Sequence, residues 1–377
     1  MDTCISHDTA LRWLLANPNP LASGLGRRCV ASLPNHAPSR GDAPLIAAAL
    51  ALDEGQPMDV LVASRGKRPQ SGRYVGHIGK DPLPTGSFIS LDRAYKGLAI
   101  VSPELLFVEM ARSHELVDLI AIGYTLCSGY RLVGENGDVM TREKNDKPLT
   151  SVERLGNYLD RAGTMRGKTA ARRALRHIAN GSLSPRESSL AMSLSLPLNL
   201  GGYALGIVEM NRSVMVQTKT SADGRAIREA RRPDVVITAR RCGGELAHAA
   251  IDYDSDAHHL DAKKREKDTV RRNDFQASLG MPYFTLTTKQ ATDYVAFEKF
   301  VHTVRRSLGI RNRLFARAEN DEERLEAIRH QQFKLWLRFL SSAAVTVGRT
   351  LSVQHAAGAR IGRQEVVGPT RAARLLA

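Results

Sequence analysis

The stretch that decides the fold begins with Arg232-Pro233-Asp234-Val235-Val236-Ile237. Asp252 follows 18 residues after Asp234, inside Ile251-Asp252-Tyr253-Asp254-Ser255-Asp256-Ala257-His258-His259. The runs Asp234 to Thr238 and Leu246 to Tyr253 are strand-like, and the intervening Cys242-Gly243-Gly244 is typical of the turn of a β-hairpin. Such a hairpin places Asp234, near the start of one strand, beside Asp252, near the end of its partner.

Two carboxylates in this position suit a divalent cation. Mg²⁺ is commonly held by one or two carboxylates, several waters and the phosphate oxygens of a substrate. The period of two along a strand also puts Asp252 and Asp254 on one face of the sheet. We therefore expect Asp234 and Asp252 on adjacent strands with their carboxylates within roughly 6 Å, a span that one cation can bridge.

The residues around this hairpin predict helices and further strands. Ser184-Pro185-Arg186-Glu187 has the cap serine, the first-turn proline and the glutamate three residues on that begin a helix. Gly206 to Glu209 is strand-like, and a charged loop is expected from there to Arg232. The elements expected beyond the hairpin are the helix His259 to Leu279, the strand Tyr283 to Thr287 and the helix Tyr294 to Leu308.

This arrangement resembles the very-short-patch-repair-like branch of the PD-(D/E)xK nuclease superfamily, whose members typically read R-P-D, then E-Y-D-G, then H-H. The resemblance covers about Ser184 to Leu308. It implies an α/β restriction-endonuclease-like fold, a central mixed sheet flanked by helices, and hydrolysis of DNA phosphodiesters with Mg²⁺ or Mn²⁺. On that match Asp234 is the aspartate of the first element and Asp252 the acidic residue of the second, and both would hold the metal.

The same resemblance assigns the remaining catalytic residues. Glu187 fits the family's helical glutamate, and His258 or His259 would position or deprotonate the attacking water. The sequence also departs from the family pattern. Asp254 stands where the lysine of the superfamily's name would fall, so a histidine is left to activate the water. Aspartate replaces the usual glutamate at Asp252, and Ser255 replaces the usual glycine.

Each of these residues also has a purely structural interpretation. A capping box accounts for Glu187, since it follows Ser184 by three residues. Histidine pairs such as His258-His259 are usually surface features, and a basic helix is usually solvated surface. Beside a phosphodiester site the same basic surface becomes a contact for the DNA backbone. The residues that we expect to bind nucleic acid are Lys263, Lys264, Arg265, Arg271, Arg272, Arg172 and Arg173.

The first region, to about Lys147, predicts an α+β domain. The elements expected in it are a short amphipathic helix in Asp2 to Leu15, strands at Asp59 to Ser64 and Leu98 to Val101, and helices at Pro103 to Arg112 and Glu115 to Cys127.

Three of its motifs resemble the core domain of AbiEi-type antitoxin regulators: Ile5-Ser6-His7-Asp8-Thr9-Ala10-Leu11, Gly97-Leu98-Ala99-Ile100-Val101-Ser102-Pro103-Glu104-Leu105 and Leu116-Val117-Asp118-Leu119-Ile120. The resemblance implies a regulatory role with a toxin partner. Those regulators usually carry an additional winged helix that this sequence lacks, so promoter binding does not transfer with it. His7 is either a capping residue or a contact.

The expected domains follow from these segments. Ser151 to Ile178 is helical and basic, with seven Lys and Arg opposed by Glu153 and Asp160; it either lies on a phosphate backbone or is a solvated connector. We expect an AbiEi-antitoxin-like α+β domain at 1–147, a basic helical connector at 148–181, a restriction-endonuclease-like domain at 182–309 and a basic helical tail, partly disordered, at 310–377.

Composition limits the classes of protein. The 377 residues carry 54 Lys and Arg against 39 Asp and Glu, a net charge of +15, which favours an anionic partner such as DNA; a basic surface without specific meaning is the alternative. No apolar run approaches the roughly 20 residues of a membrane span, and no secretory signal is recognisable. The four cysteines lack C-x-x-C spacing, so we expect reduced thiols. We place the protein in the cytoplasm, without a membrane partner.

Two hypotheses from different classes follow. The first is a metal-dependent DNA endonuclease in a bacterial defence or toxin–antitoxin context. The second is a non-catalytic DNA-binding regulator that keeps a degenerate nuclease fold as a basic scaffold. A protein-binding module of a defence system is a third interpretation.

Overall fold

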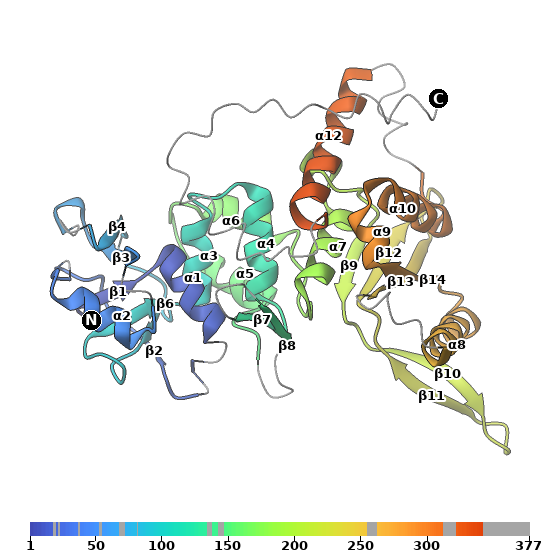
Figure 1. Ribbon diagram of the computed structural model, residues 1–377, viewed down its shortest axis with the longest axis horizontal. Coiled ribbons are helices and arrows are strands. Elements are labelled where there is room, and N and C mark those ends of the chain that lie inside the picture. The colour runs from blue at the N-terminus through green and yellow to red at the C-terminus, as the bar shows by residue number, and fades with distance from the viewer. Residues whose placement is uncertain are drawn as a thin grey trace.

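The computed structural model describes residues 1–17, 20–21, 23–36, 38–52, 55–67, 72–80, 82–133, 138–141, 147–254, 262–311 and 322–341. It is a mixed α/β protein with two principal sheets, one in each half of the chain (Figure 1). The α+β character expected of the N-terminal half is confirmed, and the C-terminal half holds the expected mixed sheet with helices beside it.

The N-terminal half is built on a six-stranded sheet in the order β2-β5-β6-β1-β3-β4. β1 pairs parallel with β6, and β3 parallel with β4, while the other pairs are antiparallel. The elements up to the last of these strands are β1 (Thr3–Ile5), α1 (His7–Ala16), β2 (Arg27–Cys29), α2 (Asp42–Ala49), β3 (Met58–Val62), η1 (Arg65–Lys67), β4 (Tyr74–Ile78), β5 (Phe88–Ser90) and β6 (Leu98–Val101).

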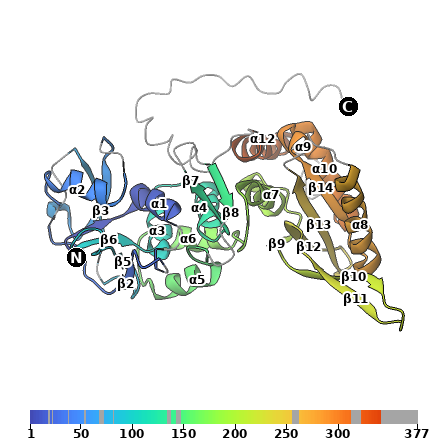
Figure 2. The same cartoon turned by 60° about the horizontal axis from the view of Figure 1, so that its bottom comes forward.

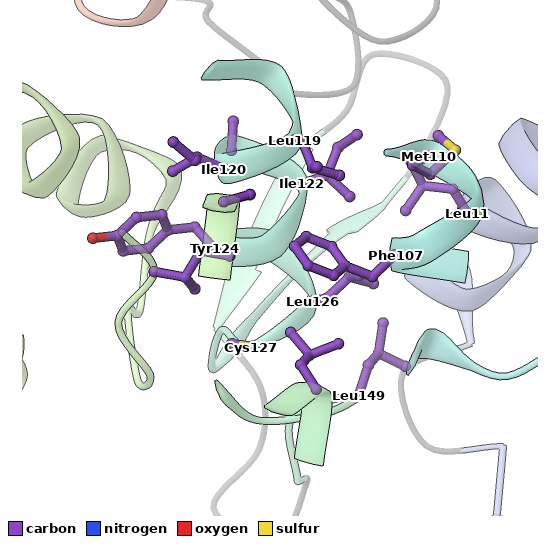
Figure 3. Close-up of a cluster of buried hydrophobic side chains, with 14 of the residues drawn as sticks. Leu11, Phe107, Met110, Leu119, Ile120, Ile122, Tyr124, Leu126, Cys127 and Leu149 are labelled. Carbon is purple, nitrogen blue, oxygen red and sulfur yellow. The ribbon is translucent and has the colours of Figure 1, made fainter. Parts of the chain in front are cut away.

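A group of helices follows and packs into one core. Its elements are α3 (Pro103–Met110), α4 (Leu116–Leu126), the hairpin β7 (Tyr130–Val133) and β8 (Asp138–Thr141), α5 (Val152–Arg161) and α6 (Lys168–Leu175). α3 begins as its sequence predicts, with the Ser102 hydroxyl accepting from the Leu105 N–H and Pro103 in the first turn. Phe107 from α3 and Tyr124 from α4 are fully buried in this core, together with Leu11 from α1 (Figure 3).

Two expectations for this half need correction. Asp2 to Leu15 is not one helix: its first residues form the three-residue strand β1, because they pair with Leu98–Ile100 of β6. The basic segment after Ser151 is not simply solvated, because α5 packs on α3 and α6 on α4, with Leu155, Tyr158 and Ala171 buried.

The C-terminal half contains a four-stranded sheet in the order β14-β13-β12-β9. β9 (Ile207–Met210), β12 (Val235–Arg240) and β13 (Leu246–Asp254) are antiparallel, and β14 (Tyr283–Thr287) joins parallel to β13. The expected hairpin is confirmed, with Gly244 at φ 88° in its turn. The helical elements around it are α7 (Pro185–Ser195), η2 (Leu198–Leu200), α8 (Ala262–Leu279), α9 (Thr288–Thr292) and α10 (Tyr294–Leu308).

The segment expected as a charged loop before Arg232 is a second hairpin. β10 (Val214–Thr220) pairs antiparallel with β11 (Ala226–Arg231), and this two-stranded ribbon projects away from the body of the molecule (Figures 1 and 2). Figure 2 also shows the four-stranded sheet between α7 on one side and α8 and α10 on the other.

The last described helix, α12 (Glu322–Phe339), joins the two halves. Its Trp336 indole N–H donates to the Ala291 carbonyl at 2.8 Å, and its Arg338 forms an ion pair with the buried Asp118 of α4. One hydrophobic core therefore runs through both halves. No helix among the described residues is both long and apolar enough to cross a membrane, and the expected disordered tail beyond position 341 lies outside those residues.

Candidate active site

The acidic site consists of Asp234, Asp252 and Glu187. It lies where the β10–β11 ribbon meets the four-stranded sheet. β9 pairs with β12, and β10 pairs with β11. Because β10 follows β9 and β12 follows β11, the two pairs form one long pair of strands that bends at Asn211 and Pro233. Proline has no N–H for a strand ladder, and Asn211 takes a left-handed φ of 49°. The Asn211 N–H donates to the Asp234 carbonyl at 2.9 Å. Asp234 is thereby fixed at the bend, one residue before β12.

Asp234 and Asp252 face each other across this bend. Val235 pairs with Ile251, and the antiparallel register therefore sets Asp234 opposite Asp252 on one face of the sheet. The Asp234 N–H donates to Asp252 Oδ1 at 3.1 Å, and the Tyr253 N–H donates to Asp234 Oδ2 at 2.7 Å. The predicted neighbourhood of the two aspartates is confirmed at the level of strand pairing; the 6 Å limit on their carboxylates stays a prediction.

Glu187, in the first turn of α7, is the third acid near Asp234 and Asp252. The Ser184 hydroxyl accepts from the Glu187 N–H at 3.2 Å, which is the expected cap. The Glu187 carboxylate accepts from the Leu183 N–H at 2.8 Å and from the Asn211 side-chain amide at 2.6 Å. The Ser184 cap is therefore present, but the Glu187 carboxylate binds the Leu183 N–H and not the Ser184 N–H of a complete capping box. It also binds Asn211, the residue at the bend beside Asp234.

The three acids act on one another electrostatically. The pKa of Asp234 is raised to about 7, first by burial and then by the charge of Glu187, with Asp252 adding to the rise. Burial raises the pKa of Glu187 as well, and the charge of Asp252 contributes. A nearby cation would favour the charged forms of all three groups.

Arg271 of α8 supplies one cation to this cluster. Its guanidinium lies 2.7 Å from Asp252 Oδ2 and also donates to the Arg232 carbonyl at 2.9 Å. It stacks over the Tyr283 ring at 5.5 Å, and the Tyr283 hydroxyl donates to the same Asp252 oxygen. Arg271 was expected to contact nucleic acid, and the structure places it inward, on Asp252.

The fit of a divalent metal depends on Asp234. Among the described residues, no three His, Cys, Asp or Glu side chains form a group that could hold a metal ion. Mg²⁺, however, needs only one or two carboxylates together with water and substrate phosphate. Asp234 and Asp252 could supply these two carboxylates, and Arg271 would compete with a cation for Asp252.

The remaining predicted residues either lie outside the described residues or are exposed on the surface. His258, His259 and Ser255 lie outside the described residues, as do the side chains of Lys263, Lys264 and Arg265. Arg272 is exposed and lines a cavity of about 600 Å³ beside Tyr283 and Thr285. Arg172 is exposed in an ion pair with Asp160 at 2.6 Å, and Arg173 is exposed on the same helix.

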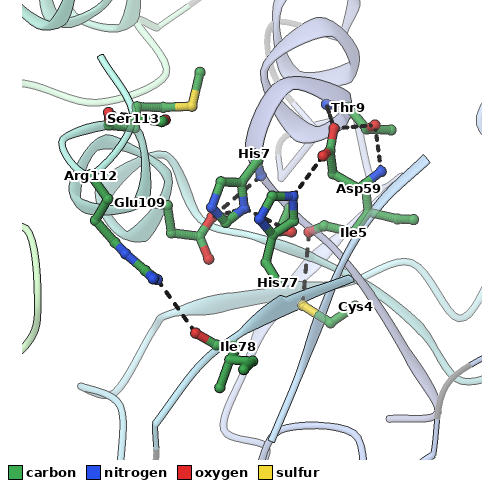
Figure 4. A network of polar contacts seen from close by, with 12 residues as sticks. Cys4, Ile5, His7, Thr9, Asp59, His77, Ile78, Glu109, Arg112 and Ser113 are labelled. Carbon is green, nitrogen blue, oxygen red and sulfur yellow. Dashed lines mark hydrogen bonds and ion pairs between the residues drawn. The ribbon is translucent and has the colours of Figure 1, made fainter. Parts of the chain in front are cut away.

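A second polar cluster, in the N-terminal half, was missed by the sequence interpretation (Figure 4). The rings of His7 and His77 stack with centroids 3.5 Å apart. His77 Nε2 lies 2.7 Å from Asp59 Oδ1, and Thr9 donates to the other oxygen of Asp59 from its N–H and its hydroxyl. The His7 N–H donates to Glu109 Oε2 at 3.4 Å.

Several features of this cluster are typical of functional sites. His7 adopts a left-handed φ of 46°, which is strained for a residue other than glycine. Burial lowers the pKa of His7 to about 3 and raises that of Glu109 to about 8. His7, His77 and Asp59 line a cavity of about 180 Å³. In the sequence, the only indication of this cluster was the interpretation of His7 as either a capping residue or a contact. No motif pointed to His77.

Comparison with known proteins adds no name to this arrangement. No family model, no curated protein and no solved structure matches the chain. Any functional conclusion therefore has to come from the sites themselves.

Proposed function

We propose that the protein is a metal-dependent DNA endonuclease on a restriction-endonuclease-like core, hydrolysing phosphodiester bonds at the acidic site. The observation that carries this proposal is the pairing of Asp234 with Asp252 on facing strands, where the charge of Glu187 also acts on Asp234. Three acids crowded at the base of a ribbon that carries several arginines suit a cation bridged to a phosphate. The defence or toxin–antitoxin context, the AbiEi-like N-terminal domain and the cytoplasmic location remain predictions from the sequence.

Each residue of the site has a distinct task in this proposal. Asp234 and Asp252 would hold Mg²⁺ or Mn²⁺, which when bound polarises the phosphoryl oxygen and stabilises developing charge. Glu187 is a positioning residue, because it anchors Asn211 and through it the backbone of Asp234. Arg271 can exchange the Asp252 carboxylate for a DNA phosphate, since a guanidinium binds both anions in the same planar geometry. His258 or His259 would activate the water.

Cleavage assays with matched variants test this function. Wild-type protein should cut DNA in the presence of Mg²⁺ or Mn²⁺, and Asp234→Asn should lose at least about 100-fold of that rate, as expected when metal-borne charge stabilisation disappears. Asp223→Asn removes an exposed acid at the ribbon tip and should cut normally. DNA binding by Asp234→Asn in EDTA should equal that of wild type. Metal-dependent cleavage that survives Asp234→Asn combined with Asp252→Asn would place the chemistry elsewhere.

One observation favours a second function, that of a non-catalytic DNA-binding regulator. Arg271 and Tyr283 already occupy one oxygen of Asp252, and the Asp234 N–H occupies the other. In a regulator this ion pair would be a permanent replacement for the metal. The two functions differ in Arg271→Ala: the nuclease should bind Mg²⁺ more tightly without the competing guanidinium, whereas the regulator should gain neither metal binding nor cleavage. Calorimetric titration with Mg²⁺ distinguishes them.

A further inference from the structure

The β10–β11 ribbon, Val214–Arg231, has one face that no described residue covers. Val216 lies on the inner face and is fully buried against Phe275 of α8. Ser278 of α8 both donates to and accepts from the backbone of Gln217, at 3.0 and 2.8 Å, which secures the free edge of β10. The base of the ribbon is thus held rigidly, while its outer face points to solvent.

The outer face carries hydrogen-bonding side chains in a fixed register. Gln217 pairs with Arg228, and Met215 with Ala230, so these four residues share the face opposite Val216. Gln217 and Arg228 are exposed, and Met215 is 51% exposed. An arginine and a glutamine side by side are the donors and acceptors that recognise guanine and adenine, and an apolar side chain beside them suits a thymine methyl group.

The charge on the ribbon favours a polyanion. Val214–Arg231 carries four basic and two acidic residues. Arg225 and Arg231 form ion pairs with Asp223 and Glu229, respectively. Lys219 and Arg228 are exposed and form no ion pair with another described residue.

The width of the ribbon also matches the width of the major groove of duplex DNA. Two paired strands lie about 4.8 Å apart, and the major groove of B-DNA, about 12 Å wide, admits a two-stranded ribbon. Arg228 precedes Asp234 by six residues, a reach of at most about 20 Å at 3.3 Å per residue. That distance corresponds to about six base pairs of duplex.

We propose that the ribbon enters the major groove of duplex DNA, where Gln217 and Arg228 contact base edges and Lys219 contacts the backbone. This inference rests on the proposed function, which it deepens by naming the substrate as duplex DNA recognised by sequence. The bases that are read lie within about six pairs of the phosphodiester at the acidic site.

The test is selection of binding sites from a random duplex library by the full-length protein in EDTA, compared among wild type, Arg228→Ala and Lys219→Ala. Wild type should select a short motif that contains a guanine. Arg228→Ala should lose roughly 5- to 100-fold of the discrimination at that guanine. Lys219→Ala should weaken binding to all sequences alike and reduce the slope of log affinity against log salt by about 1. Unchanged melting temperatures of both variants would show that the fold is intact.

The outcomes separate this inference from the nuclease proposal. Suppose that wild type selects a motif, that Arg228→Ala relaxes this motif, and that wild type does not cleave DNA with any metal tested. This result would support base recognition by the ribbon and overturn the proposal of a nuclease. Cleavage that depends on Asp234, with no motif or with the same motif in Arg228→Ala, would retain the nuclease and overturn the ribbon. Dimethyl sulfate footprinting adds a direct readout: guanine N7 in the motif should be protected by wild type and exposed in Arg228→Ala, and protection that persists in the variant contradicts base contact by Arg228.

Discussion

Replacement of Asp234 by asparagine should change how stability depends on pH. The pKa of Asp234 is raised from 3.8 to about 7 in the folded protein. Between these values the folded state binds more protons than the unfolded state, so the free energy of unfolding falls as pH rises from about 4 to 7 and stays low above that. Asparagine keeps a side-chain oxygen for the Tyr253 N–H and removes the charge. The variant should therefore lack this part of the decline.

The magnitude follows from the shift. Roughly three pH units correspond to about 4 kcal/mol at 1.36 kcal/mol per unit. Asp234 is partly exposed, and solvent screening lowers the figure to about 2 to 4 kcal/mol. Asp234→Asn should thus be more stable than wild type by about this amount at pH 8, by roughly a third of it at pH 5, and nearly equal to it below about pH 4. Glu187, whose pKa is also raised, leaves a residual slope of the same sign in both proteins.

Urea unfolding of the full chain at pH 5, 6, 7 and 8 measures this difference. Asp223→Asn is the matched control, because the pKa of the exposed Asp223 is lowered by Ser221 and its contribution is lost only below about pH 4. Adding Mg²⁺ should raise the stability of wild type at pH 8 and leave Asp234→Asn unchanged, since a bound cation reverses the penalty. Parallel pH profiles for wild type and Asp234→Asn would refute the electrostatic description of the acid cluster.

Two further predictions concern the rest of the molecule. A Cβ on Gly202 would lie 2.1 Å from the Leu196 carbonyl oxygen, so Gly202→Ala should lower the free energy of unfolding by roughly 1 to 3 kcal/mol. In the control Gly243→Ala the added Cβ would meet no atom within 4 Å, so the change should be small. Equal melting temperatures of the two variants would contradict the close packing at Gly202. Under native conditions Ellman's reagent should label the exposed Cys242 quickly and spare Cys4, which is buried and whose pKa burial raises; fast labelling of Cys4 would show that its strand opens.

The sequence was informative wherever the signal was local. Glycines at the turn and apolar runs on both sides were enough to predict the hairpin of Asp234 and Asp252, and cap residues marked the starts of α3 and α7. The ribbon was missed because it has polar side chains on both faces beyond Val216, so it shows no apolar alternation. β1 was missed because three residues become a strand only through their neighbours.

The candidate site shows the same division. The pairing of the two aspartates followed from strand order, but the inward turn of Arg271 depends on α8 crossing the sheet edge at β14, which no local pattern encodes. The contact between Glu187 and Asn211 depends likewise on the bend of the ribbon. His7 and His77 come from α1 and β4, and only the pairing of the intervening β3 with β4 stacks them. Long-range packing, rather than residue type, determines these contacts.

The position of α12 has a consequence for synthesis of the protein. Among the described elements it leaves the ribosome last, yet its Leu335, Trp336 and Phe339 are buried in the core that it shares with the earlier elements. At 5 to 20 residues per second, translation from the end of α10 through α12 takes on the order of a few seconds. During that interval the nascent chain exposes the apolar surface that α12 later covers. Chaperone binding and premature aggregation should therefore be concentrated in this short window of translation.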